Sequence, residues 1–169
     1  DIKKKIDVRV IQYKNFDKEY CKEEITVGGQ LCYPRMINNI TNYERRTYLI
    51  IELIRRLIDN DKKILILSNR RNHLTRIHEL VTQLNIATVG FYVGGMKQKD
   101  LDISETKQIL LGTYSMSSEG MDIPDLDALI LASPKSNIIQ SVGRILRKNH
   151  TSNPIVYDIV DQFSKFPNQ

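Results

Sequence analysis

Short apolar runs, separated by segments with helical periodicity, constrain the fold more than any other feature of this sequence. Apolar residues in these runs follow one another without alternating with polar ones, which is typical of strands buried on both faces. The intervening segments are long enough to cross over between parallel strands. We therefore predict an α/β fold in which helices cover both faces of a parallel β-sheet. The runs are residues 63–67, 86–93, 108–111, 128–131 and 154–160.

The remaining segments complete one predicted domain over residues 1–169. Residues 6–13 alternate well enough for an N-terminal strand, and residues 72–84 and 97–105 have the pattern of helices. A longer helix is predicted to begin at Thr41 or Asn42, either of which can cap it, and to continue to Ile58. Residues 14–41 do not fit this alternation, since Pro34 interrupts them and residues 25–29 resemble a short strand entering a turn. We expect them to be an excursion from the main fold.

Composition narrows the class of protein. The chain has 169 residues, 41% of them hydrophobic and 27% charged, which predicts a globular domain rather than a disordered one. Its formal net charge of +5 favours a polyanionic partner, although an excess of solvated lysines is the commoner cause of such a value. Neither a signal peptide nor a membrane span is found, so we expect an intracellular protein with no membrane partner. Because the first residue is Asp1, we expect the chain to be part of a longer protein.

Small, polar or basic residues follow four of the predicted strands. Because parallel strands present their carboxyl ends at one edge of a sheet, where ligands bind, these residues predict a binding surface. A metal site is not predicted, because the cysteines and histidines lack the spacing of metal ligands. The residues at the four strand ends are Ser68, Asn69 and Arg70; Gly94 and Gly95; Gly112 and Thr113; and Ser133, Pro134 and Lys135.

Residues 138–147 predict an amphipathic helix with a phosphate-binding face. At helical spacing, Gln140, Gly143, Arg144 and Arg147 fall on one stripe, and the apolar residues fall on the opposite side. The polar stripe contains no acid. Two guanidinium groups one turn apart suit a multiply charged oxyanion such as a phosphate chain.

A nucleotide-hydrolysing loop is missing from the sequence. Residues 90–97 resemble a phosphate-binding loop only superficially, because no lysine and hydroxyl residue directly follow the second glycine. No Asp-Glu pair follows a predicted strand to hold magnesium and activate water. We therefore expect this chain alone to hydrolyse no nucleotide.

Three segments resemble motifs of the superfamily 2 helicases and translocases. Residues 140–147, Gln-Ser-Val-Gly-Arg-Ile-Leu-Arg, are similar to motif VI of that family, and residues 112–124 are similar to motif V. Residues 64–70 stand where motif IV is found. Motifs V and VI in this order, separated by one strand, are a specific combination, and the resemblance covers residues 62–160. It implies a RecA-like helicase C-terminal domain, the second lobe of a motor whose N-terminal RecA-like lobe belongs to the same protein.

The resemblance also implies residue roles on the nucleotide side. Arg144 and Arg147 would act as catalytic arginine fingers toward the γ-phosphate of ATP, and Gln140 would couple nucleotide to nucleic acid. Magnesium and most of the ATP would be held by the first lobe. Gly120, Asp122 and Gly143 would line the nucleotide, although Asp122 could equally be a turn cap.

On the nucleic-acid side, the resemblance implies contacts with a DNA or RNA backbone that do not read sequence. Arg70 could instead be the solvated start of a helix. The implied contact residues are Ser68, Asn69, Arg70, Gly94, Gly95, Gly112 and Thr113.

Two residues distinguish branches within the resembled family. Glu119 and Gln140 stand where DEAD-box helicases carry arginine and histidine, which favours the branch of DNA-repair, transcription-associated and large cytoplasmic DNA virus helicases. For a viral protein, the expected location is the host cytoplasm or the virion. An alternative remains open: a non-catalytic module that binds nucleic acid or protein and keeps the RecA-like fold without the motor.

Overall fold

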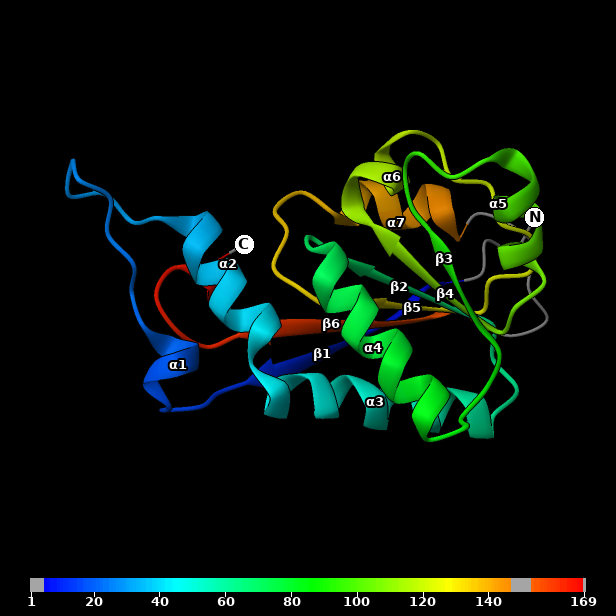
Figure 1. The fold of residues 1–169 in the computed structure, drawn as a ribbon, viewed down its shortest axis with the longest axis horizontal. Helices are drawn as coiled ribbons and strands as arrows, with labels where there is room; N and C mark the ends of the chain where they lie inside the picture. Colours follow the sequence, from blue (N-terminus) through cyan, green and yellow to red (C-terminus); the bar gives the residue numbers. More distant parts are fainter. Residues whose placement is uncertain (1–4, 147–152, 169) are drawn as a thin grey trace.

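The sheet predicted from the apolar runs is present and parallel throughout. The computed structural model describes residues 5–146 and 153–168. In this part of the chain, six strands form one sheet in the order β1-β6-β5-β2-β4-β3, and every neighbouring pair is parallel (Figure 1). The strands are β1 (Asp7–Tyr13), β2 (Ile64–Ser68), β3 (Val89–Tyr92), β4 (Ile109–Thr113), β5 (Ala128–Leu131) and β6 (Ile155–Asp161).

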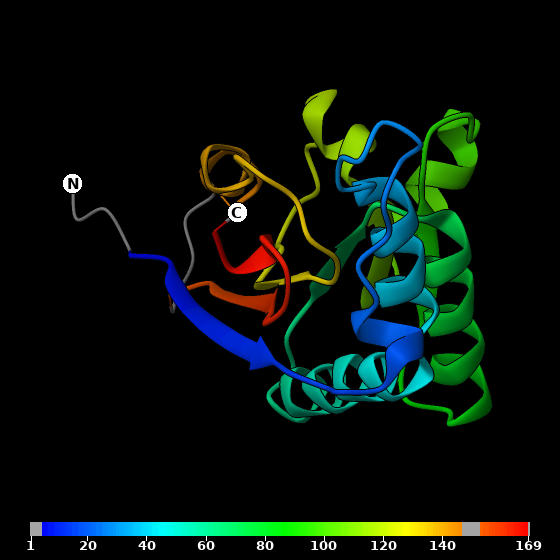
Figure 2. The ribbon, with the colours of Figure 1, turned by 90° about the vertical axis from the view of Figure 1, so that its left-hand side faces the viewer.

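Helices cover both faces of the sheet, as predicted. On one face lie α3 (Glu44–Asp59) and α4 (Arg71–Gln83), which pack on Ile64 and Ile66 of β2. On the other face, the alternate strand residues Leu65 and Leu67 pack against the second group of helices. Figure 2 shows α7 and α3 on opposite sides of β1 and β6. Because β2 is buried on both faces, its sequence is apolar without alternation. The second group is α5 (Gln98–Glu105), α6 (Tyr114–Ser118) and α7 (Ile139–Ile145).

Residues 14–41, expected to be an excursion, contain two helices that pack on the domain. These are α1 (Lys18–Cys21) and α2 (Tyr33–Asn42). Pro34 lies in the first turn of α2, where its missing N–H is not needed, so it begins a helix instead of interrupting one. Between the helices, residues 25–29 form a turn with a single bridge rather than a short strand.

A third hydrophobic cluster joins this segment to the end of the chain. Tyr20, Met36, Ile40 and Tyr43 pack with Phe166 of the short helix η1 (Phe166–Asn168). All five side chains are buried. The excursion is therefore attached to the domain by its own apolar core.

The predicted start of the long helix at Thr41 or Asn42 is wrong, because these residues end α2. Helix α3 begins at Glu44, after Tyr43 in an extended conformation. The Thr41 hydroxyl donates to the carbonyl of Ile37, one turn back in α2, instead of capping α3. Local sequence could not reveal this break, since a tertiary contact of Tyr43 in the third cluster accompanies it.

The other boundaries agree with the structure to within a few residues. The largest difference is β3, which begins at Val89 because Ile86 belongs to the turn that follows α4. The short helix α6 was not predicted. None of the helices in residues 5–146 and 153–168 is long and apolar enough to cross a membrane.

Candidate functional site

The four strand ends predicted to form a surface meet at one edge of the sheet. All six strands of the described chain run in the same direction, so β2, β3, β4 and β5 end on the same side. Two regions of this edge contain the residues predicted for the site. One surrounds α7 and the turn after α6, and we call it the α7 half. The other surrounds the loop between β2 and α4, and we call it the β2–α4 half.

Helix α7 has the two faces predicted from its sequence. Val142 and Ile145 are buried against the sheet, and Gln140, Gly143 and Arg144 are exposed. The second predicted arginine, Arg147, lies outside the described residues. The exposed face therefore presents one described guanidinium group, at Arg144.

Gly120 and Arg144, far apart in sequence, line the same small hollow of about 170 Å³. Gly120 has a φ of +89°, a left-handed conformation that glycine adopts without the strain a side chain would cause. No described residue forms a hydrogen bond or ion pair with the Arg144 guanidinium. Exposed backbone and an unneutralised cation make this hollow suitable for an anion. Its other lining residues are Ser117, Ser118, Met121, Ser141 and Ile145.

The other residues predicted for the nucleotide side do not line this hollow. Gln140 faces a neighbouring, larger hollow of about 440 Å³, together with Lys135 and Asp158. Asp122 is exposed after the α6 turn. At Gly143 an added Cβ would meet no described atom within 4 Å, so packing within this lobe does not require a glycine there.

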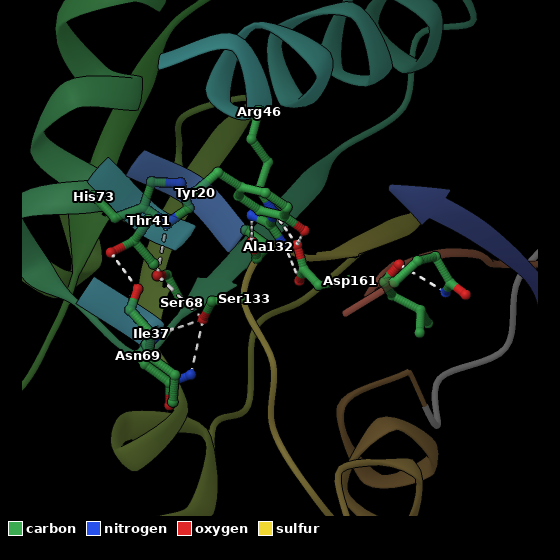
Figure 3. Close-up of polar contacts among 12 residues, drawn as sticks. Tyr20, Ile37, Thr41, Arg46, Ser68, Asn69, His73, Ala132, Ser133 and Asp161 are labelled. Atoms are coloured by element: carbon green, nitrogen blue, oxygen red, sulfur yellow. Dashed lines mark hydrogen bonds and ion pairs between the residues drawn. The ribbon is translucent and has the colours of Figure 1, made fainter. Parts of the chain in front are cut away.

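In the β2–α4 half, hydrogen bonds fix the loop that follows β2 (Figure 3). The Ser133 hydroxyl accepts from the backbone N–H of Asn69 at 2.8 Å and from its side-chain Nδ2 at 2.9 Å. The Asn69 amide also donates to the Pro134 carbonyl. Ser68 is fully buried, and its Oγ lies 2.8 Å from His73 Nδ1. Ser68 thus holds the loop from beneath, and half-buried Asn69 reaches the surface.

Two arginines extend this half in opposite directions. Arg70 turns toward α2, where its Nε donates to Asn38 Oδ1 at 2.7 Å and its Nη2 to the Pro34 carbonyl at 3.2 Å. Arg71 Nη2 donates to the carbonyl of Gly94 at 2.8 Å, which ties α4 to the turn after β3. In that turn Gly95 has a φ of +86°. Helix α2, the start of α4 and the turn after β3 thereby form one continuous surface.

Thr113 and Asn69 line a shared hollow of about 460 Å³. The Thr113 hydroxyl accepts from the backbone N–H of Met116 at 3.4 Å, so it also caps α6. Gly112 precedes it inside β4 and is buried, where a Cβ would lie 3.1 Å from the Tyr92 carbonyl oxygen. Gly112 therefore serves close strand packing. The other residues of this hollow, which the sequence did not single out together, are Arg71, Tyr114, Ser115, Ser118 and Lys135.

Beneath this half lies a buried ion pair that sequence reasoning missed (Figure 3). The fully buried side chains of Arg46 in α3 and Asp161 in β6 form a bidentate pair, with N–O distances of 2.8 and 2.9 Å. Arg46 also donates to the carbonyl of Ala132, and the Tyr20 hydroxyl donates to Asp161. Burial, followed by the charge of Asp161, raises the pKa of the Tyr20 phenol. This network joins α1, α3, β6 and the residue that follows β5, directly below the Ser133 loop.

His73 is the second buried polar group in this region. Burial, aided by the nearby charge of Arg46, lowers the pKa of the His73 imidazole to about 3. Its Nδ1 faces the Ser68 hydroxyl, and its Nε2 has no hydrogen-bond partner among the described residues. The imidazole is therefore neutral near pH 7. With 1% of its surface exposed, His73 packs inside the domain.

The sequence matches the model of a known domain family. The helicase conserved C-terminal domain family matches residues 47–149. This chain belongs to that family.

Particular relatives refine the comparison. Protein L396 of Acanthamoeba polyphaga mimivirus, whose name assigns it to the ATP-dependent RNA helicases, is 42% identical over 91% of this chain and 31% of its own length. This chain therefore spans about a third of that relative. The crystal structure of T4 UvsW matches with a TM-score of 0.73 at 22% identity, over 92% of this chain and 32% of the other. The Sulfolobus solfataricus SWI2/SNF2 ATPase core in complex with dsDNA matches with a TM-score of 0.60 at 16% identity, over 76% and 31%.

Proposed function

We propose that this chain is the second motor lobe of an ATP-dependent helicase or translocase. In this proposal it supplies charge to a nucleotide held mainly by an N-terminal RecA-like lobe, and it binds a nucleic-acid backbone along the rest of its carboxyl edge. By itself the chain is inactive as an ATPase.

The observation that carries the proposal is the incomplete anion site formed by Gly120 and Arg144. Its volume of about 170 Å³ is below the ~300 Å³ at which pockets for whole small molecules begin. It therefore fits part of a nucleotide, such as a phosphate group, and a second surface must enclose the remainder. The unpaired guanidinium of Arg144 suits phosphate oxygens, so the residues present fit ATP.

Each residue of the α7 half has a role in this mechanism. Arg144, together with Arg147 three residues later in the sequence, stabilises negative charge on the transferring phosphoryl group. Gly143 lets the opposite lobe or the nucleotide approach the helix closely. Gln140 faces the hollow shared with Lys135, so it links the nucleotide side of α7 to the loop after β5. Asp122 contacts the ribose or orients an arginine. The first lobe would hold magnesium together with the phosphates, and this metal would supply further positive charge to the phosphate oxygens.

The β2–α4 half binds one strand through its phosphates. Asn69 and Thr113 provide polar contacts from one hollow, and Gly94 and Gly95 offer exposed backbone in the turn beside it. Ser68, Arg70 and Gly112 position these groups. The dsDNA complex of a structural neighbour and the RNA helicase name of the viral relative support a phosphodiester partner of either kind. Because phosphate contacts carry no sequence information, binding is sequence-independent and weakens with salt.

The test is Arg144→Ala in the full-length protein that contains both lobes. An arginine finger contributes about 10³–10⁵ in rate, so nucleic-acid-stimulated ATPase activity should fall by about that factor while nucleic-acid binding persists. Arg55→Ala, an exposed arginine of α3, is the matched control and should retain activity. Undiminished hydrolysis in the Arg144 variant would contradict the proposal and favour the non-catalytic binding module.

The isolated chain supplies a second test. Purified residues 1–169 should show no ATPase activity above background with or without oligo(dT) or oligo(rU). Hydrolysis that co-purifies with this chain and disappears in the Arg144→Ala variant would show that a first lobe is not required.

A further inference from the structure

Helix α2 lies outside the region that the family match covers, yet it borders the candidate nucleic-acid surface. The match begins at residue 47, after α2 (Tyr33–Asn42) has ended. Figure 1 shows α2 beside α4, at the same end of the domain as the loop after β5.

Hydrogen bonds join α2 to the β2–α4 half at three points. Arg70 donates to Asn38 and to the carbonyl of Pro34, and Asn72 Nδ2 donates to Asn42 Oδ1 at 3.2 Å. The two ends of α2 are therefore both fixed against the start of α4. An extended ligand bound along the β2–α4 half can therefore also contact α2, because the two surfaces are directly adjacent.

The outward face of α2 has the composition of a backbone-binding surface. Arg35, Asn38 and Asn42 recur at helical spacing and are exposed. The opposite face, with Met36 and Ile40, is fully buried in the third cluster, so the orientation of the polar face is fixed. Cations and amides are the side chains that contact phosphate and sugar oxygens.

Two acids that flank this surface, Glu24 and Glu44, are paired with basic residues. Glu44, at the start of α3, forms an ion pair with Arg76, and Glu24 forms one with Lys22 at 3.6 Å. Glu24 also accepts from Asn39, on the side of α2 away from Arg70. The polar face thus continues the positive charge of Arg70 and Arg71 without an unpaired acid among the carboxylates named here.

We propose that α2 is an additional nucleic-acid contact of this lobe. Arg35, Asn38 and Asn42 bind the phosphodiester backbone of the strand where it leaves the β2–α4 half, which lengthens the segment that the lobe covers. The inference rests on the proposed function for the identity of the partner, but it concerns residues that play no part in the ATP chemistry.

The experiment compares two double variants of the 169-residue chain that change charge equally. Arg35→Glu with Asn42→Asp alters α2 and keeps the oxygen that accepts from Asn72. Arg55→Glu with Asn60→Asp makes the same change on exposed residues at the far end of α3. Binding of fluorescent oligo(dT) and oligo(rU), of about 8 and about 20 nucleotides, is measured by anisotropy over a salt series.

The expected result is that the wild type and the α3 control bind the longer oligomers more tightly than the shorter ones. The α2 variant should lose about tenfold affinity for the longer oligomers and much less for the shorter. The slope of log affinity against log salt concentration should become shallower by about one for each phosphate contact that is lost. Comparing oligo(dT) with oligo(rU) shows whether the backbone is DNA, RNA or either. Equal weakening by the α2 and α3 variants would overturn the proposal.

A third variant separates this inference from the proposed function. Lys135→Glu alters the hollow that contains Asn69 and Thr113, but it lies away from α2 contacts in the described chain. If Lys135→Glu binds normally and the α2 variant does not, the strand surface proposed for the β2–α4 half is wrong and the α2 contact stands. If wild type binds neither oligomer, both are overturned.

Discussion

The two halves of the carboxyl edge differ in how completely they are assembled. In the β2–α4 half, Asn69 and Arg70 are held by several hydrogen bonds each, above a buried ion pair. In the α7 half, Arg144 has no partner among the described residues, and the hollow beside it is small. Hydrogen bonds within the chain organise the β2–α4 half, whereas the α7 half presents a guanidinium group that no described residue engages.

This difference suggests a division of labour. A surface that tracks a strand must keep its shape through every cycle, so rigid support suits the β2–α4 half. A surface that completes a nucleotide site at an interface must change partners as the lobes close and open. Substitutions should therefore affect stability on one side and activity on the other, and the following predictions test that contrast.

The largest expected loss of stability follows from Arg46→Met. This change leaves the Asp161 carboxylate buried without its partner, which typically costs about 3–5 kcal/mol. Urea denaturation followed by circular dichroism measures it. The neighbouring Arg45→Met is the control, since Arg45 is 73% exposed and its ion pair with Asp17, at 3.7 Å, contributes little. Similar midpoints for the two variants would show that the network does not support the edge.

A pH dependence should arise from His73. Its pKa is 6.5 when unperturbed and about 3 in the folded chain, so between these values the unfolded state binds more protons. Stability is therefore lost as pH falls below 6.5, by about 1.4 kcal/mol per pH unit, or about 2 kcal/mol at pH 5. Urea denaturation at several pH values should show this slope in the wild type and a shallower one in His73→Gln. Parallel pH profiles would contradict the burial of a neutral imidazole.

A smaller effect is expected from Asn69→Ala. The variant loses the two amide hydrogen bonds to Ser133 and Pro134, but the backbone N–H of residue 69 still donates to Ser133. We expect a loss of about 1 kcal/mol of unfolding free energy, together with weaker oligonucleotide binding. Asn72→Ala, which removes an exposed amide nearby, should change stability less. A loss of binding with unchanged stability would mean that Asn69 contacts the strand without shaping the loop.

The smallest change in stability is expected from Arg144→Ala in the isolated chain. Since no described residue pairs with this guanidinium, the unfolding free energy should change by less than about 0.5 kcal/mol. Thermal and urea denaturation measure this directly. A loss of unfolding free energy comparable to that of Arg46→Met would mean that contacts within the chain stabilise the α7 half as much as the β2–α4 half. The proposed difference between the two halves would then be wrong.

The sheet and the meeting of its strand ends at one edge were predictable because their signals are local. Unalternating runs such as Ile64–Leu67 can be buried only between two layers, and parallel strands then bring their ends to one edge. The two faces of α7 follow from residue spacing alone, and they are confirmed for its described side chains. Motifs V and VI indicated the family for the same reason, since each is a contiguous segment.

The features that were not predicted correctly depend on contacts between residues that are distant in sequence. Arg46 and Asp161 each look like ordinary charged residues, and only the fold shows that they meet in a buried pair. The break between α2 and α3 occurs at Tyr43, whose side chain is buried in a cluster that also contains Phe166, near the other end of the sequence. Likewise, Gln140 and Arg144 lie on one stripe of α7 but face different hollows, which helical spacing does not distinguish.

The pairing of β1 with β6 has a consequence for biosynthesis. Among the six described strands, residues 7–13 are synthesised first, but their only strand neighbour in the described sheet is residues 155–161, which are synthesised last of the six. Until then β1 has an unpaired backbone, with Val8 and Val10 exposed even in the finished domain. Contacts between such distant segments are slow to form and leave strand edges open to aggregation. The lobe should therefore complete its fold only after translation has passed β6, and chaperone dependence during synthesis should concentrate on this first strand.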